Sequence, residues 1–255
     1  MLSDMRLTLL ERPTASTAQE FPSRLERRLE ELKGELNASV KFEGSSHGGW
    51  AIVSITGEDS EIMSELTRSE FAVTHTESGL IKLQDNLPAE IVESDPNGLK
   101  VDIGLGTKLQ CLIPTANLNA QLADGKALPL RQLMECYSLY PGVRVCVRVA
   151  EKNDYEIKTW LADSSTDTIG DWVKTGLDRI QVLECFKTEA ETAVTKAHLS
   201  RDVLAVDSMT LTTQSIVCKL GTDAIGLMPK LGRFLREQPL KPFQPRKIMS
   251  RCRPW

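Results

Sequence analysis

Hydrophobic and polar positions change their period twice along this chain. In the N-terminal part, apolar residues recur at helical spacing from Phe21 to Leu36 with charged residues between them, which predicts an amphipathic helix. Other runs have strand or helix patterns; by residue number they are 5–10 (strand), 40–43 and 50–55 (strands) and 60–71 (helix). We therefore expect a βαββα half over residues 1–80.

The middle of the chain, from about residue 87 to 162, has short β-rich runs separated by turns. These runs cover residues 88–93, 99–103, 110–113, 143–149 and 157–161. The segment 95–98, Asp-Pro-Asn-Gly, predicts a hairpin turn, because proline presets φ and Asn-Gly tolerates positive φ. A longer connection with a helical pattern at 130–137 separates the third run from the fourth. Five short strands arranged in this way predict a small Greek-key barrel, here over residues 81–163.

The last part of the chain shows the order of the first part again. Residues 164–176 are polar and are interpreted as a linker. Strand-like runs at 178–185, 203–206 and 215–219 then alternate with helical segments. We expect a second βαββα half over 177–240 and a basic tail over 241–255. The predicted fold class is α+β, with the barrel inserted between two ferredoxin-like halves.

Composition places the chain among ordinary globular proteins. It has 255 residues, of which 41% are hydrophobic and 26% charged, as is usual for soluble domains. It contains no apolar run of the roughly 18 residues that a membrane span requires, and its first residues do not resemble a signal peptide. These features predict a cytoplasmic protein without membrane contact.

The cysteines do not have the spacing of metal ligands. Six are present, none in a CxxC pair, and the three histidines are distant from them in sequence. We interpret the six cysteines as free thiols in a reducing compartment, and we assign neither a metal nor a cofactor.

Charge is unevenly distributed along the chain. The formal net charge is −4, from 31 basic and 35 acidic residues. The C-terminal end, residues 229–255, is nevertheless basic. Against one acid, Glu237, it has eight basic residues: Lys230, Arg233, Arg236, Lys241, Arg246, Lys247, Arg251 and Arg253. Such an asymmetry indicates a partner with negative charge, and we interpret the tail either as an RNA-backbone contact or as an extension packed on the acidic body.

Three segments of the predicted barrel resemble the S1 RNA-binding pattern. They are the glycine-led strand at 98–102, the proline-ended strand at 112–114 and the Pro-Gly-introduced strand at 140–149. The resemblance implies an OB-type barrel that binds RNA. The second and third strands, however, contain no aromatic residue, and we place Trp50, Trp160 and Trp172 in the core. Backbone and shape recognition is therefore expected in place of base stacking.

The whole chain also resembles an uncharacterised archaeal protein family. The resemblance depends mainly on residues 217–233, which contain three glycines and a Met-Pro-Lys segment. It implies the domain layout given above and an archaeal cytosolic origin, and it implies no activity.

The same C-terminal segment contains a candidate phosphate site. Gly221, Gly226 and Gly232 would let backbone N–H groups approach a phosphate, and the nearby lysines and arginine would supply charge. The alternative is that the glycines form turns and Pro229 starts a helix. The Gly-Lys-Ser/Thr ending of a Walker A loop is absent, so nucleotide hydrolysis is not expected.

The sequence predicts a non-catalytic protein that binds structured RNA, such as ribosomal or transfer RNA, mainly through its backbone. The predicted contacts are all basic: Arg144, Arg148, Lys219, Lys230, Arg233, Arg246 and Lys247. The alternative is an adaptor of the archaeal translation or transcription machinery that contacts protein only. A third, an enzyme, would need a site built from residues that no spacing pairs, and we assign no catalytic residue.

Overall fold

The computed structural model describes residues 5–74, 80–105 and 110–251, with the side chains of residues 249 and 251 left aside. The protein is a mixed α+β structure with one closed five-stranded barrel and two other sheets, as predicted. It divides into two compact units: the chain up to Leu80 with a short segment from Ile103, and the remainder.

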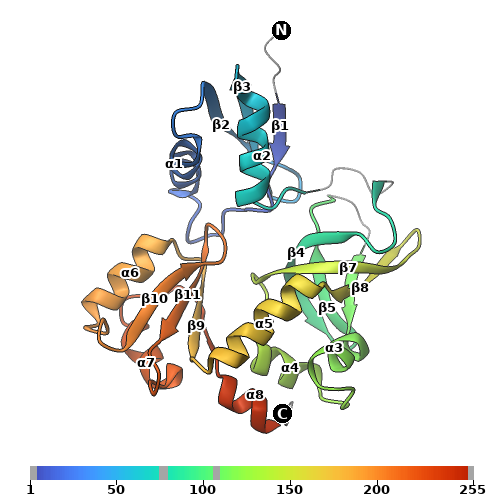
Figure 1. The fold of residues 1–255 in the computed structure, drawn as a ribbon, viewed down its shortest axis with the longest axis vertical. Coiled ribbons are helices and arrows are strands. Elements are labelled where there is room, and N and C mark those ends of the chain that lie inside the picture. The colour runs from blue at the N-terminus through green and yellow to red at the C-terminus, as the bar shows by residue number, and fades with distance from the viewer. Residues whose placement is uncertain (1–4, 75–79, 106–109, 252–255) are drawn as a thin grey trace. The chain divides into compact units, whose positions relative to one another are not determined.

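The first unit contains a three-stranded antiparallel sheet of order β1-β3-β2 and two helices (Figure 1). Its elements are β1 (Met5–Thr8), α1 (Phe21–Lys33), β2 (Ala38–Ser45), β3 (Ala51–Gly57) and α2 (Ser60–Glu70). Phe21, Leu25 and Leu29, spaced at helical intervals, are the buried residues of α1. Beyond α2, Val73 forms an antiparallel bridge with Leu9, so a third, single-bridge pairing lies beside the first strand.

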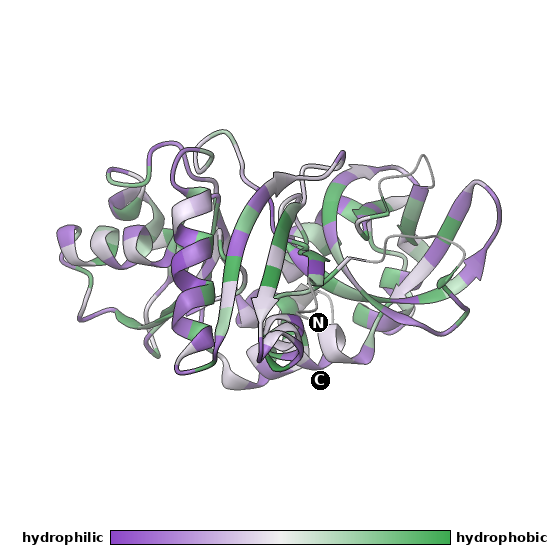
Figure 2. Cartoon of the chain, turned by 90° about the horizontal axis from the view of Figure 1, so that it is seen from above, coloured by the Kyte–Doolittle hydropathy of each residue, from purple (hydrophilic) through white to green (hydrophobic). Residues whose placement is uncertain are grey.

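The barrel is closed by strands in the order β4-β5-β6-β8-β7. Its elements are β4 (Asn86–Asp95), β5 (Gly98–Asp102), β6 (Gln110–Pro114), α3 (Thr115–Leu122), α4 (Leu130–Tyr137), β7 (Arg144–Lys152) and β8 (Glu156–Leu161). Asp95 Oδ1 accepts from the amide of Asn97 at 2.8 Å, which stabilises the predicted hairpin turn. Hydrophobic and polar positions alternate along strands (Figure 2), as is expected where one face of a strand is buried.

The C-terminal domain is a four-stranded antiparallel sheet of order β10-β11-β9-β12. Its elements are β9 (Arg179–Leu183), α6 (Lys187–Lys196), β10 (Val203–Ser208), β11 (Thr213–Cys218), α7 (Ala224–Leu231), β12 (Leu240–Phe243) and α8 (Pro245–Arg251). One sheet face and the helices α6 and α7 share a core that includes Ile180, Ile216 and Leu227.

Two predicted boundaries differ from the structure. The expected linker at 164–176 is helical, because α5 (Asp163–Thr175) buries Ile169 and Val173 along one side. The C-terminal half was expected to end at residue 240 and the basic tail to begin at residue 241. In the structure, residues 240–243 form β12, which pairs with β9, so the sheet extends into the expected tail. Proline is tolerated at position 242 because β12 is an edge strand.

Candidate functional site: a pocket on the barrel surface

The two predicted arginines of the barrel lie on β7, next to α5. Arg144 and Arg148 alternate with buried valines and therefore point out of the barrel. Arg148 Nη1 forms an ion pair with Asp163 Oδ2 at 3.4 Å, and Arg144 lies opposite Glu90 in the strand register. Ser165 of α5 accepts from the Cys146 amide at 2.7 Å. Helix α5 therefore covers this side of the barrel, where the two predicted contact arginines lie.

The other predicted basic residues belong to the C-terminal domain. Lys219 follows β11, and its Nζ lies 3.4 Å from the carbonyl oxygen of Ser200. Lys230 is in the last turn of α7 and Arg233 follows that helix, and both are exposed. A further pair, Arg246 and Lys247, is exposed on α8, while Arg253 and Trp255 lie outside the described residues.

At the start of α7, acidic side chains occupy the position of the predicted phosphate cradle. Asp223 Oδ2 accepts from the Gly226 amide at 3.0 Å and Asp178 Oδ2 accepts from the Ala224 amide at 3.1 Å. A phosphate placed here would meet two carboxylates and no free amide at these positions.

The other two predicted glycines have structural roles. Gly221 has a φ of +87° in the turn before α7, a conformation that glycine adopts without strain. The Gly232 amide donates to the Met228 carbonyl at 2.8 Å. Gly221 therefore belongs to a turn and Gly232 to a helix end, as the alternative interpretation expected, but Gly226 lies in the first turn of α7. Pro229 does not start a helix as that interpretation also expected, because it lies inside α7.

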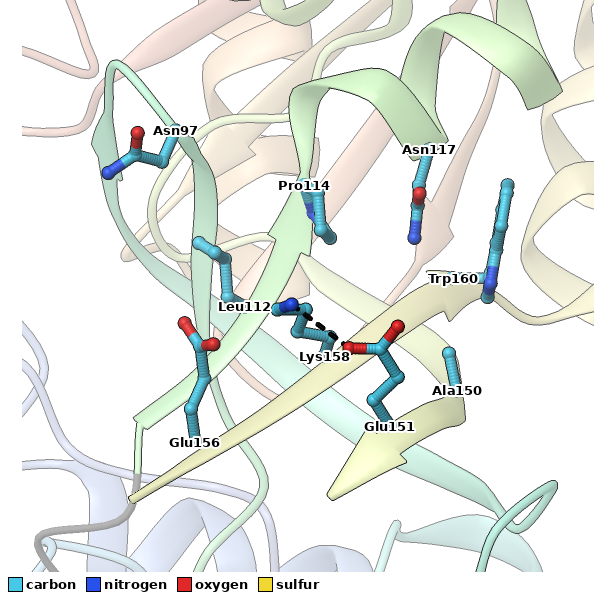
Figure 3. A pocket seen from close by; sticks show the side chains of 9 residues that line it. All are labelled: Asn97, Leu112, Pro114, Asn117, Ala150, Glu151, Glu156, Lys158 and Trp160. Carbon is cyan, nitrogen blue, oxygen red and sulfur yellow. Dashed lines mark hydrogen bonds and ion pairs between the residues drawn. The ribbon is translucent and has the colours of Figure 1, made fainter. Parts of the chain in front are cut away.

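A pocket of about 490 Å³ opens on the barrel surface, on the side formed by β6 and β8 (Figure 3). Residues from these two strands, the end of β7, the β4–β5 turn and the start of α3 line it. They are Asn97, Leu112, Pro114, Asn117, Ala150, Glu151, Glu156, Lys158 and Trp160.

Strand alternation explains why polar and aromatic side chains meet there. Ile157, Thr159 and Leu161 are fully buried, so the intervening residues of β8 point outward. The parallel pairing of β6 with β8 places Leu112 beside Lys158. The pocket floor is thus built from outward positions of two neighbouring strands.

Trp160 stands at one end of the pocket, and its side chain is half-buried. Asn117 and Pro114 are drawn across from its ring (Figure 3). Asn117 Nδ2 donates to the carbonyl of Thr159 at 3.0 Å, which holds the amide in place and leaves its oxygen able to accept. This end of the pocket offers a flat apolar surface with a fixed acceptor nearby.

The pocket also contains an ion pair. Lys158 Nζ lies 2.9 Å from Glu151 Oε2, and the hydrogen bond to Glu151 raises the pKa of Lys158, so the lysine stays charged at neutral pH. A second carboxylate, Glu156, lines the same pocket and has no ion-pair partner within the described part of the chain. With two carboxylates and one ammonium group, the lining carries a net charge of −1.

The pocket was not predicted from the sequence, because Trp160 was assigned to the core. Trp50 is fully buried as expected, and Trp172 packs against Phe243 with ring centroids 5.3 Å apart. Trp160 is partly buried like Trp172, and it lines the pocket. The sequence does contain a signal for the outward position of Trp160. Glu156, Lys158 and Trp160 follow each other at every second position, so their side chains lie on one face of the strand, and the two charged residues mark that face as the outward one.

Neither a metal site nor a membrane span is found in the part of the chain that the structure describes. Residues 5–74, 80–105 and 110–251 contain no group of three or more His, Cys, Asp or Glu side chains placed to hold an ion. No described helix combines the length and apolar character needed to cross a bilayer.

Comparison with known proteins identifies one domain. Residues 177–240 match the family model of the DUF2110 C-terminal domain, a domain of unknown function. No curated protein matches the chain. Among solved structures, the crystal structure of a protein from vaccinia virus (Wisconsin strain) is similar at 15% identity and a TM-score of 0.24, covering 32% of this chain and 90% of that chain. A similarity this weak carries no argument about the present protein.

Proposed function

We propose that the protein binds single-stranded RNA through the pocket face of its barrel and performs no chemistry on it. The observation that carries the proposal is the position of Trp160, an aromatic ring at the end of an open pocket lined by hydrogen-bonding side chains. Stacking of one base on an aromatic side chain stabilises a complex by about 1–3 kcal/mol. This proposal differs from the sequence-based expectation, which was recognition of structured RNA through its backbone and not by base stacking.

The strand order of the barrel supports the proposal. The third and fifth strands, β6 and β8, pair in parallel, and β7 closes the barrel against β4. This is the arrangement expected of an OB fold, in which the second and third strands and two hairpin loops bind nucleotides. We infer an S1-type OB barrel on this basis. The pocket includes β6, the β4–β5 turn and the end of the β7–β8 hairpin, which are parts of that face.

The charge of the pocket favours bases over phosphates inside it. Its net charge of −1 repels a phosphate, whereas a neutral base can enter and stack. Phosphates outside the pocket would need positive charge, and the exposed Lys230, Arg233, Arg246 and Lys247 supply it on the C-terminal domain. We therefore assign base contacts to the barrel and backbone contacts to this basic set.

The two end domains are inferred to be ferredoxin-like. In the C-terminal domain the fourth strand, β12, lies beside the first, β9, and the third, β11, lies on its other side. The first unit has the same order β1-β3-β2, with the Leu9–Val73 bridge in the place of the fourth strand.

Fluorescence anisotropy with a labelled, unstructured oligoribonucleotide tests the RNA proposal. We expect Trp160→Ala to weaken binding roughly five- to hundredfold, the equivalent of about 1–3 kcal/mol, and Trp160→Phe to retain most of the affinity. A salt series on the wild type should show affinity falling as salt rises. Equal binding by wild type and Trp160→Ala, or no binding at low salt, would refute the proposal.

The acidic lining favours one second candidate, docking of a basic protein segment. An arginine or lysine head can lie over a tryptophan face while carboxylates pair with its charge, and Glu151 and Glu156 are both in the pocket. An arginine-containing peptide titrated against wild type and Glu156→Gln distinguishes the candidates. Protein docking requires the peptide, and not RNA, to lose affinity in that variant.

A further inference from the structure

We propose that the barrel pocket selects a guanine base, and that the ion pair between Lys158 and Glu151 reads its edge. This proposal rests on the RNA-binding function proposed above. It adds base specificity, which neither the fold nor an aromatic ring supplies, because every base has a face that can stack.

The ion pair has the hydrogen-bonding pattern that guanine requires. The Watson–Crick edge of guanine presents one acceptor, O6, followed by two donors, N1–H and the N2 amino group. Lys158 Nζ is a donor, and it lies 2.9 Å from Glu151, whose two oxygens are acceptors. One ammonium group beside one carboxylate therefore complements the three positions of the guanine edge in order.

The pocket places this pair where the edge of a stacked base would reach it. Figure 3 shows the Glu151 carboxylate between the Lys158 ammonium group and the Trp160 ring. Asn117 is fixed by its hydrogen bond to the Thr159 carbonyl at 3.0 Å and lies across from the ring. A base stacked on Trp160 would thus direct one edge toward the ion pair.

An excess of acceptors in the pocket disfavours the other bases. Besides Glu151, the lining offers the Glu156 carboxylate and the Asn117 side-chain oxygen as acceptors. On their Watson–Crick edges, uracil and adenine each have a single donor position, and cytosine has one donor with two acceptors. Guanine alone brings two neighbouring donors, so it alone can donate to both oxygens of one carboxylate while its O6 accepts from the ammonium group.

The barrel contains a matched control for this pair. Lys100 Nζ lies 3.0 Å from Glu93 Oε2, and these residues face each other on β5 and β4 just as Lys158 faces Glu151 on β8 and β7. Each glutamate follows a β-bulge. The Lys100–Glu93 pair does not line the pocket, so its removal should not change base preference.

The test compares short oligouridylates that carry a single central guanine, adenine, cytosine or inosine, measured by fluorescence anisotropy. Wild type should bind the guanine oligomer about tenfold more tightly than the adenine and cytosine oligomers. Inosine, which lacks the N2 amino group, should lose part of that advantage. Glu151→Gln and Lys158→Met should remove the preference and keep the weaker general binding, whereas Glu93→Gln should preserve it, with thermal melting to show that each variant folds.

The outcomes separate the two proposals. Equal binding of all four oligomers by wild type overturns base selection and leaves RNA binding standing. A guanine preference that is retained in both Glu151→Gln and Lys158→Met also overturns base selection by the ion pair, because Lys158 and Glu151 would then not be the groups that recognise guanine. Absence of binding to any oligomer overturns both.

Discussion

The side-chain amide of Gln244 donates to Asp223 Oδ1 at 2.8 Å. The same nitrogen also lies 3.2 Å from Asp178 Oδ2, so one side chain connects the segment between β12 and α8 to the beginnings of α7 and β9. Each carboxylate accepts an amide of the first turn of α7 as well. The Gln244 side chain therefore anchors the residues after β12 to the C-terminal domain. The Ala224 and Gly226 amides at the start of α7 already donate to carboxylates.

Replacing Gln244 with alanine should lower the free energy of unfolding by about 1–3 kcal/mol, since two carboxylates lose a partly buried donor. Chemical denaturation followed by circular dichroism measures the change. Gln238→Ala is the control, because Gln238 is a partly buried glutamine shortly before β12 for which the structure shows no side-chain hydrogen bond. An equal loss in both variants would contradict the role given to Gln244.

Local patterns in the sequence were sufficient to predict the barrel, because each of its strands has its own alternation or apolar run. Helix α5 could not be predicted in this way. Its first turns are rich in Asp, Ser and Thr, which have low helix propensity, and its stability comes from contacts distant in sequence. Trp172 of α5 packs against Phe243, and the Arg179 guanidinium lies 4.8 Å from the Trp172 ring.

The candidate site was predicted less well than the fold, for a related reason. Basic residues were chosen by charge, but Arg148 is already paired with Asp163, a contact that depends on how α5 packs. The pocket, by contrast, depends on the parallel pairing of β6 with β8, strands separated by more than forty residues. The alternation within each strand sets which side chains face outward, but it does not specify which distant strand lies beside it.

Deletion of residues 241–255 should unfold or strongly destabilise the C-terminal domain, because it removes most of β12 and with it Phe243, a fully buried side chain. Loss of RNA binding in that deletion would therefore not locate an RNA contact. Arg246→Ala with Lys247→Ala, both exposed on α8, removes charge only. We expect this double variant to keep the wild-type melting temperature and to bind RNA with a smaller salt dependence. An unchanged salt dependence would exclude α8 from the interface.

Two glycine substitutions should have opposite effects on stability. A Cβ at Gly98 would overlap the Ile113 carbonyl oxygen, so Gly98→Ala should separate β5 from β6 and destabilise the barrel. Gly170 lies inside α5 with nothing within 4 Å of an added Cβ, so Gly170→Ala should stabilise by about 0.4–1 kcal/mol. The melting temperatures of both variants, compared with that of the wild type, test these two expectations. Destabilisation by Gly170→Ala would show that residues 163–175 do not form the helix described.

Three buried cysteines should make the protein less stable at alkaline pH. Burial is the main cause that raises the pKa of Cys111, Cys185 and Cys218 from 9.0 to about 12. The folded protein thus holds these thiols protonated at pH values where the unfolded chain has begun to ionise them. Their contribution to stability is complete below a pH of about 9 and is lost as the pH rises toward 12.

Denaturant unfolding across this pH range, for wild type and for Cys185→Ala, measures the effect, and the variant should lose less stability per pH unit. Alkylation at mildly alkaline pH gives an independent measurement, because the thiolate is the reactive form. In the native protein, site-resolved mass spectrometry should find these three cysteines unmodified, and in denaturant fully modified. Rapid native alkylation of Cys185 or Cys218 would mean that the core shared by the C-terminal sheet and its helices opens readily, because both thiols belong to it.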